Sequence, residues 1–352
     1  RKLLDAFAQP FVIDRREIHL SGSIGISVFP DDSDSSSGLL KNADIAMYRA
    51  KDQGGSVYEF YASHPNLHSV ERLSLESKLQ RAIEREEFTL HYQPRVDIRN
   101  GRIVCAEALI RWQHPDLGLV LPETFIPLAE ESGLIVPLGD WVLRQACLQM
   151  RQFQERGLPS LRVAVNLSGR QFGQPDLASR VTAALEAAQL DAGRLEVEIT
   201  ESMVMTDAER SIEILREMAA RRIIISIDDF GTGYSSLSYL KRFPIHNLKI
   251  DRAFITDLPH DSDDAAITQA VIAMAHRLGL RVVAEGVELP EQLLFLAAND
   301  CDEVQGYLLA KPMPAHELET LIRHGIEIPI DAASRRDLRD TARPQSRSAR
   351  NS

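Results

Sequence analysis

The feature that most constrains this chain is an alternation of short apolar runs with longer amphipathic segments, which extends from residue 88 to residue 305. The short runs are typical of β-strands, and the longer segments carry apolar residues at helical spacing. The strands predicted in this way are 88–93, 103–112, 161–167, 195–200, 223–228, 247–251, 281–284 and 303–305. Eight strands with helices between them predict an α/β fold, a TIM-like (β/α)8 barrel, with an open doubly wound sheet as the alternative.

The intervening helical patterns are clearest at 138–156, 208–221, 265–278 and 290–299. The start of the barrel departs from strict alternation, because residues 97–102 have the composition of a turn. We therefore expect the first two strands to be antiparallel neighbours. Residues 88–328 are assigned to the barrel, and residues 63–87, which carry a helical pattern, to a connecting helix that leads into it.

The segments on either side of the barrel have a different character. Residues 1–62 predict an incomplete α+β domain, with a hairpin formed by 11–13 and 18–28 and a helix at 39–51. Such a fragment is too small to close a core alone, so we expect it to pack on missing sequence or on the barrel. Residues 329–352 are polar and arginine-rich, and we expect this tail to be disordered.

Composition excludes several classes of protein. The 352 residues carry a formal net charge of -11, which argues against DNA or RNA as the main partner. The three cysteines show no paired spacing, which disfavours disulfides or a zinc site and fits a reducing cytoplasm. No apolar run approaches the roughly 20 residues of a membrane span. Because the chain begins at Arg1 rather than Met, we expect a longer parent protein that could be tethered to a membrane by upstream segments.

The stretch from Ser226 to Leu237 concentrates the polar chemistry of the chain. The apolar run at 223–227 predicts a buried strand that stops at two adjacent carboxylates, Asp228 and Asp229. Because neighbouring strand residues point to opposite faces, both carboxylates can serve one site only if the strand ends there. A glycine-rich loop follows these carboxylates, and we expect this loop to be able to move over the site.

Other predicted strands also end in a carboxylate, an amide or an amine. These residues are Glu107, Asn166, Glu198, Asp228, Asp229, Lys249, Asp251, Glu285 and Gln305, with Glu201 and Glu288 just beyond. In a barrel the strand ends converge on one face, which is where barrel enzymes hold their active sites. A lone strand-end glutamate is more often structural, but so acidic a rim repels itself unless cations relieve the charge. Oxygen ligands without histidine or cysteine clusters favour Mg²⁺ or Mn²⁺ over zinc.

This constellation fits the hydrolysis of a small phosphodiester. Two metal ions about 3.5–4 Å apart can lower the pKa of a bridging water and stabilise charge on the phosphate. A lysine beside that water can stabilise the transition state. The substrate would be small, because the charge of the protein repels long polyanions.

The same residues resemble the EAL family of cyclic di-GMP phosphodiesterases. The segment Glu107–Arg111 reproduces the Glu-Ala-Leu signature of that family. The rest of the pattern is matched by Tyr92–Pro94, Val165–Ser168, Glu198–Glu201, Asp228–Gly233, Leu248–Arg252, Ala284–Glu288 and Gln305–Tyr307. The resemblance covers about residues 70–325 and implies a metal-dependent opening of cyclic di-GMP to linear pGpG.

Carried over by position, the resemblance implies a role for each matching residue. The metal ligands would be Glu107, Asn166, Glu198, Asp228, Asp229 and Glu285, with Asp228 shared between two ions. The catalytic residues would be Lys249, which orients the attacking water, Glu285 as an alternative general base, Gln305 and Glu107. The substrate contacts would be Arg111, Gln93 and Leu109. Glu201 would anchor the glycine-rich loop, with Asp251 and Glu288 behind the ligands.

Two positions depart from the family pattern. Arg95 and Cys105 occupy places that are usually apolar or small, and we expect them to flank the site without disturbing a ligand. In the N-terminal segment, residues 21–27 and 42–51 resemble the second half of a GGDEF diguanylate cyclase domain. The Gly-Gly-Asp-Glu-Phe turn of that family is absent, so no cyclase activity is expected.

The alternative function is a non-catalytic cyclic di-GMP receptor that relays binding to a partner. The incomplete N-terminal domain favours it, since tandem proteins of this kind often keep one half for regulation. The resemblance also implies a homodimer formed through the barrel. It further implies an upstream sensor, or a complete GGDEF domain, in the parent protein.

Overall fold

The computed structural model describes residues 11–13, 16–18, 23–30, 32–33, 35–52, 58–61, 78–231 and 237–326. The chain divides into two compact units between Leu75 and Glu76. Our expectations for the connecting segment 63–77, most of the glycine-rich loop and the arginine-rich tail lie outside the described residues. Among the helices of the described ranges, none combines the length and the apolar character that a membrane span requires.

The described residues of the N-terminal unit form two small sheets and one long helix. Its elements are β1 (Phe11–Ile13), β2 (Arg16–Ile18), β3 (Ile24–Ile26), α2 (Ser36–Asp52) and β4 (Tyr58–Phe60). β1 and β2 are antiparallel, whereas β3 and β4 are parallel and are joined through α2, because a parallel pair needs a long crossover. Gly25 lets α2 approach β3 closely, since a Cβ there would lie 1.9 Å from the carbonyl oxygen of Ala43.

The predicted N-terminal hairpin is only partly correct. The pairing of β1 with β2 confirms a hairpin, but Arg16 belongs to β2 and not to the connection between the two predicted strands. The second predicted strand, 18–28, was wrong as one element, because Ile24–Ile26 forms β3 and pairs with β4 instead. The helix predicted at 39–51 is present as α2.

The second unit begins, within the described residues, with a helix at 78–84 and continues as alternating strands and helices. Its strands are β5 (Phe88–Asp97), β6 (Ile103–His114), β7 (Gly118–Val120), β8 (Arg162–Asn166), β9 (Leu195–Thr200), β10 (Ile224–Phe230), β11 (Asn247–Ile250), β12 (Arg281–Ala284), β13 (Glu303–Val304) and β14 (Met313–Pro314). Its helices are α4 (Pro122–Ser132), α5 (Ile135–Glu155), α6 (Gly169–Phe172), α7 (Leu177–Ala188), η1 (Ala192–Arg194), α8 (Glu201–Thr206), α9 (Ala208–Ala220), α10 (Leu237–Leu240), η2 (Arg252–Phe254), α11 (Ser262–Arg277), α12 (Pro290–Ala298) and α13 (Ala315–His324).

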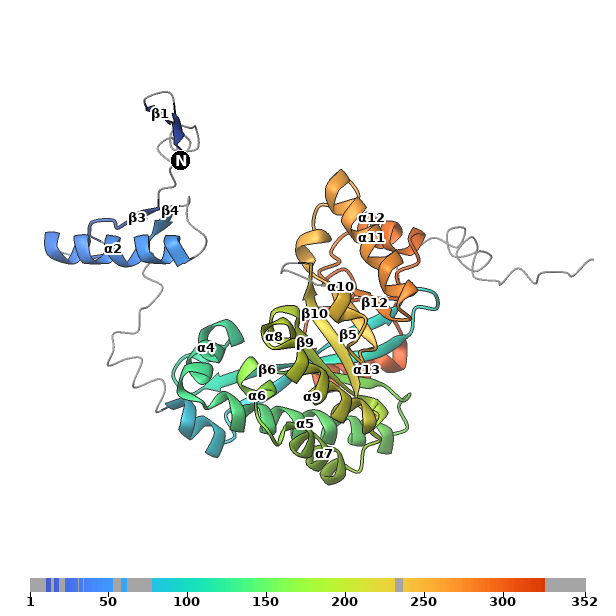
Figure 1. Ribbon diagram of the computed structural model, residues 1–352. Coiled ribbons are helices and arrows are strands. Elements are labelled where there is room, and N and C mark those ends of the chain that lie inside the picture. Colours follow the sequence, from blue (N-terminus) through green and yellow to red (C-terminus); the bar gives the residue numbers. More distant parts are fainter. Residues whose placement is uncertain are drawn as a thin grey trace, which may run out of the picture. The chain divides into compact units, whose positions relative to one another are not determined.

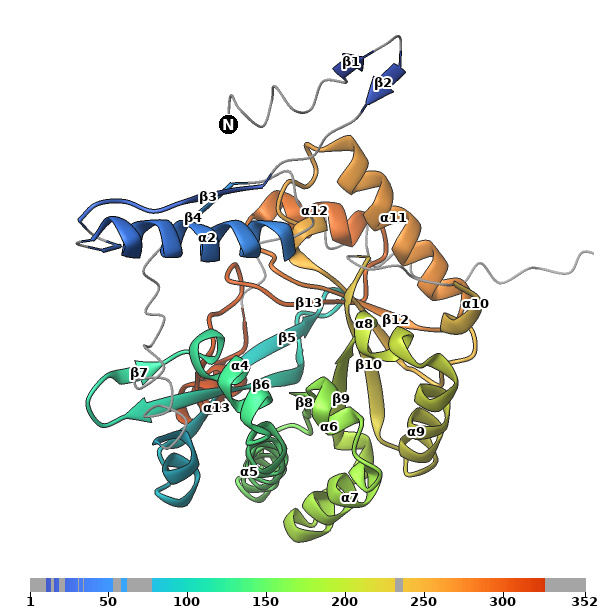
Figure 2. The same cartoon turned by 60° about the vertical axis from the view of Figure 1, so that its left-hand side comes forward.

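Eight of these strands close into the predicted barrel, with helices such as α5, α7 and α9 around the outside (Figures 1 and 2). From β6 through β8 to β13 the barrel strands are parallel neighbours. β5 closes the ring by antiparallel pairing with both β6 and β13. The closed ring confirms the TIM-like fold with an antiparallel first strand and excludes the open doubly wound sheet.

The alternation of side chains along each strand decides which residues line the barrel interior. On β10, Ser226 and Asp228 point inward, where they contact Glu196 and Lys249. The isoleucines on either side are buried and point outward toward the helices. Because parallel strands share one direction, their carboxyl ends meet at one end of the barrel and gather the polar residues there.

Candidate active site

The end of β10 brings two adjacent carboxylates to one side of the barrel. The strand does not stop at Asp228, as the sequence predicted, but continues to Phe230. A bulge replaces the expected ending: Asp229 has a φ of 54°, and the pairing with β11 shifts between Ile227 and Phe230. A bulge re-aims the side chain that it carries. Carboxylate oxygens of Asp228, Asp229 and Glu285 consequently all lie within 4.8 Å of one another.

Lys249 lies at the centre of the carboxylates. Its Nζ is 2.7 Å from Glu198 Oε2, 3.0 Å from Asp228 Oδ2 and 2.6 Å from Glu285 Oε1. The side chain of Lys249 is only 1% exposed. Burial alone would lower the pKa of Lys249, but the surrounding carboxylates raise it well above its ordinary value. Lys249 is therefore a fixed cation that ties the ends of β9, β10, β11 and β12 together.

A second hydrogen-bonded group forms on the β5, β6, β8 and β13 side of the same site. Asn166 Nδ2 donates to Glu107 Oε1 at 2.6 Å, and Gln305 Nε2 donates to Glu107 Oε2 at 2.5 Å. Gln305 Nε2 also lies 3.0 Å from Gln93 Oε1, and Gln93 donates to the carbonyl of Ala310. These bonds hold both oxygens of Glu107 in place.

Both groups open onto one cavity of about 280 Å³. Its lining residues are Gln93, Glu107, Leu109, Asn166, Asp228, Arg252, Glu285, Gly286, Glu288, Gln305, Gly306 and Tyr307. Most of the predicted site residues therefore face a shared space. Lys249 and Asp229 are not part of this lining but contact residues that are, since Lys249 reaches Asp228 and Glu285 and the backbone N–H of Asp229 donates to Asp228. Glu198 also lies outside the lining and contacts Lys249.

The carboxylates of the site are hard to ionise together. Burial and the neighbouring carboxylates of Asp228 and Asp251 raise the pKa of Asp229 to about 6. Burial raises the pKa of Glu285 to about 8, although the nearby Lys249 lowers it. Lys249 by itself does not neutralise so many negative charges, and a bound cation would favour their ionised forms.

The remaining predicted residues lie around this centre in different ways. Glu201 accepts a hydrogen bond from the backbone N–H of Gly231 at 3.0 Å, at the start of the glycine-rich loop. Asp251 caps η2 through the N–H of Ala253. Glu288 is exposed at the rim of the cavity. Arg111 is 9% exposed and donates to the carbonyl of Ile110, while burial lowers its pKa.

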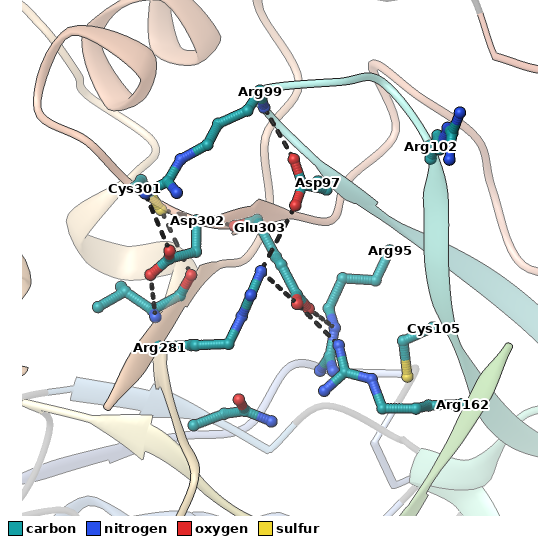
Figure 3. Close-up of polar contacts among 12 residues, drawn as sticks. Arg95, Asp97, Arg99, Arg102, Cys105, Arg162, Arg281, Cys301, Asp302 and Glu303 are labelled. Carbon is teal, nitrogen blue, oxygen red and sulfur yellow. Dashed lines mark hydrogen bonds and ion pairs between the residues drawn. The ribbon is translucent and has the colours of Figure 1, made fainter. Parts of the chain in front are cut away.

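Charged residues also lie directly beneath the site, deeper in the barrel, where the sequence predicted none. Arg95 Nη2 is 2.5 Å from Glu196 Oε2, and its Nε is 2.7 Å from Glu303 Oε2. Arg162 and Arg281 also reach Glu303, so that three guanidinium groups meet at one carboxylate (Figure 3). Arg95 thus lies inside the barrel, in contact with a predicted ligand, Glu198, rather than merely beside the site.

The signal that could have revealed this buried cluster is the two-residue period of a strand. On five strands a site residue lies two positions from a residue of the cluster, if Ser226 and Asn247, which donate to Glu196, are counted in it. The pairs are Gln93 and Arg95, Glu198 and Glu196, Asp228 and Ser226, Lys249 and Asn247, and Gln305 and Glu303. On β5 the cluster residue follows the site residue, because β5 runs antiparallel to its neighbours.

The residues present fit divalent cations. Asp228, Asp229 and Glu285 form a compact set of oxygen donors. Gln305 Oε1 is a buried acceptor without a hydrogen-bond partner among the residues that the structure describes, so it is available to a bound water. Oxygen donors of this kind suit Mg²⁺ or Mn²⁺.

This fold and site define a barrel that gathers carboxylates at the ends of its parallel strands, and comparison with known proteins gives the family. Residues 76–312 match the EAL domain, and the chain belongs to this family. Residues 1–56 match the diguanylate cyclase GGDEF domain in part.

Named relatives agree with this assignment. The bifunctional diguanylate cyclase/cyclic di-GMP phosphodiesterase MucR of Pseudomonas aeruginosa is 49% identical over 317 residues, which are 90% of this chain and 46% of MucR. The cyclic di-GMP phosphodiesterase PdeR of Escherichia coli is 38% identical over 318 residues, 90% of this chain and 48% of PdeR. The chain thus spans about half the length of these relatives. The solved PaMucR phosphodiesterase in complex with c-di-GMP is 50% identical, with a TM-score of 0.68 over 70% of this chain and 99% of that one.

Proposed function

We propose that this chain is a phosphodiesterase that hydrolyses cyclic di-GMP to linear pGpG and requires Mg²⁺ or Mn²⁺. The observation that carries the proposal is the cluster of Asp228, Asp229 and Glu285 around the buried Lys249, in a cavity shared with Glu107. The names of the relatives support the choice of substrate, and so does the c-di-GMP bound to PaMucR.

The oxygen donors divide into two sets that would hold two cations. Glu107, Asn166, Glu198 and Asp228 would hold the first, and Asp228, Asp229 and Glu285 the second. Support for the first set comes from the contact between Asn166 and Glu107 and from the shared contact of Glu198 and Asp228 with Lys249. Support for the second set comes from the close approach of its three carboxylates. Bound cations of this kind would acidify the attacking water and offset the charge of the scissile phosphate.

The side chains of the protein supply the remaining chemistry. Lys249 would donate a hydrogen bond to the attacking water and offset negative charge in the transition state. Glu285, which lines the cavity and lies 2.6 Å from Lys249, would alternatively act as general base through a water. Gln305, whose Oε1 has no partner among the described residues, would accept a hydrogen bond from the same water.

Residues at the rim would position the nucleotide. Arg111 would contact a substrate phosphate, because it lies on the same face of β6 as Glu107 and, within the described residues, one of its donors is committed to a backbone carbonyl. Gln93 and Leu109 would contact a base or sugar, since both line the cavity. Glu201 would hold the start of the glycine-rich loop, with Asp251 and Glu288 supporting the ligands from outside.

The proposal is tested by the substitution Glu107→Ala. This change removes a carboxylate that binds both Asn166 and Gln305, and we expect it to abolish pGpG formation at saturating Mn²⁺. Glu213→Ala, on the exposed face of α9, is the matched control and should retain activity. Full activity of Glu107→Ala would refute the assignment. Retention of intact nucleotide by the unaltered chain would instead identify a receptor.

The family resemblance supports two further proposals about the assembly. The barrel would pair with a second copy of the chain, which light scattering of the purified protein would detect as twice the mass of one chain. The parent protein would carry additional segments, because the named relatives are about twice as long as the part that this chain matches.

A further inference from the structure

The residues under the active site form a charged layer in the barrel interior, a place usually filled by branched apolar side chains. Arg95 contacts three carboxylates with three different nitrogens: Nη2 meets Glu196, Nε meets Glu303, and Nη1 lies 3.4 Å from Glu198 Oε1. All four side chains are no more than 1% exposed. Water therefore does not solvate these charges, and their mutual contacts fix their positions.

The layer is balanced without Glu198. Glu196 accepts hydrogen bonds from Ser226 and Asn247 in addition to its contacts with Arg95 and Arg162. Arg95, which is buried, and Arg162, which is 17% exposed, thus face two buried glutamates, Glu196 and Glu303. Arg281, the third arginine at Glu303, is also paired with Asp97, so its charge has a partner of its own. The contact between Arg95 and Glu198 is the one direct ion pair, within the described residues, that joins this layer to the proposed metal ligands.

Glu198 is held from both sides. Its Oε2 accepts from Lys249 at 2.7 Å, and its Oε1 faces Arg95. A carboxylate fixed at both oxygens keeps its plane and its distance to a neighbouring cation, whereas a carboxylate held at one oxygen can rotate. Side chains that orient metal ligands in this way commonly change metal affinity or activity ten- to hundredfold when they are removed.

We propose that Arg95 is a positioning residue that orients Glu198 from beneath and thereby strengthens the binding of the first cation. This inference rests on the proposed function, because it takes Glu198 to be a metal ligand. Arg95 itself touches neither substrate nor cation.

The test is the affinity of the full chain for Mn²⁺, measured by isothermal titration calorimetry without nucleotide. We expect Arg95→Met to weaken Mn²⁺ binding about ten- to hundredfold. Arg95→Lys keeps the charge but loses the simultaneous contact with three carboxylates. Its affinity for Mn²⁺ should therefore lie between those of Arg95→Met and the unaltered chain. Arg162→Met is the matched control, since Arg162 contacts Glu196 and Glu303 but has no ion pair with Glu198, and its Mn²⁺ affinity should equal that of the unaltered chain.

A fold-preserving variant keeps the test decisive if Arg95→Met destabilises the barrel. Arg95→Met combined with Glu196→Gln removes one charge of each sign from the layer, while Ser226 and Asn247 can still donate to the glutamine oxygen. We expect this double variant to melt close to the unaltered chain and still to bind Mn²⁺ weakly. A Glu196→Gln single variant, with Arg95 in place, should bind Mn²⁺ normally.

Three results would overturn the inference. Unchanged affinity in the double variant would show that Glu198 needs no support from beneath. Tighter binding would show that Arg95 acts only as a cation that repels Mn²⁺. Equal weakening by Arg162→Met would assign the effect to the whole layer. If the unaltered chain bound no Mn²⁺, the proposed function would fail first and the inference with it, which separates the two failures.

Discussion

Replacing Lys249 by methionine removes an amine that contacts three of the site carboxylates. Lys249 is 1% exposed, and methionine has a similar length without the charge. Glu198, Asp228 and Glu285 would then face one another without the cation that holds them at 2.6–3.0 Å. We therefore expect a large loss of stability in the absence of metal.

The magnitude follows from the burial of the ion pairs. Removing one partner of a buried ion pair costs about 3–5 kcal/mol, because it leaves a charge uncompensated. In a domain of this size each kcal/mol lowers Tm by roughly 2–4 °C, so the barrel should melt about 6–20 °C lower. Mn²⁺ at a concentration of about one hundred times its Kd adds roughly 2.7 kcal/mol to any protein that binds it only when folded. At the same Mn²⁺ concentration, the stability of the variant should increase more than that of the unaltered chain, because its carboxylates lack the charge of Lys249.

Scanning calorimetry with and without Mn²⁺ measures both effects. Lys241→Met is the control, since Lys241 is an exposed lysine whose loss changes the net charge equally. It should shift Tm by less than about 2 °C, as surface substitutions do. The reasoning is refuted if Lys249→Met melts like the control, or if Mn²⁺ stabilises the variant less than the unaltered chain.

Three further predictions concern other parts of the barrel unit. Glu201→Gln keeps a hydrogen bond to Gly231 but loses the charge of the acceptor, which weakens that bond by about 1 kcal/mol. The kcat/KM for cyclic di-GMP should therefore fall about fivefold, while the circular dichroism spectrum stays unchanged. An unchanged kcat/KM would contradict the anchoring role. Gly306→Ala places a Cβ 2.1 Å from the carbonyl oxygen of Val287. Thermal melting should therefore show a loss of about 1–3 kcal/mol in the free energy of unfolding. An unaltered Tm would mean that the backbone moves to accept the methyl group. The three cysteines are buried with raised thiol pKa values, so DTNB should label them in urea but only slowly in the native chain; rapid native labelling would contradict their burial.

The barrel could be predicted from the sequence because its strands combine apolar runs with recurring helical segments. β10 and β11 are runs of this kind, and their observed bounds lie within two residues of the predicted ones. β4, β7 and β14 have only two or three residues, too few for a period to show, and they exist because a neighbouring strand offers an edge.

Most of the predicted site residues were brought together as expected, but the geometry of the candidate site was not predictable. Lys249 and Gln305 follow from their positions at strand ends, since parallel strands bring these ends together. Glu107 was wrongly predicted at a strand end: it lies within β6, which continues to His114, and it reaches the site because the parallel pairing of β6 with β8 ends at Ala108. The bulge at Asp229 could not be foreseen, because a left-handed conformation of a non-glycine residue is imposed by the surrounding structure. The pairing of Arg95 with Glu196 joins positions about one hundred residues apart, and it depends on the stagger of the closed barrel rather than on local pattern.

The most direct test of the central claim is to incubate the purified chain with cyclic di-GMP and Mg²⁺ or Mn²⁺, with and without a chelator, and to separate the nucleotides by chromatography. We expect linear pGpG to accumulate with metal and to be absent with the chelator. Intact cyclic di-GMP that remains on the protein in the presence of metal would contradict the account and identify the chain as a receptor.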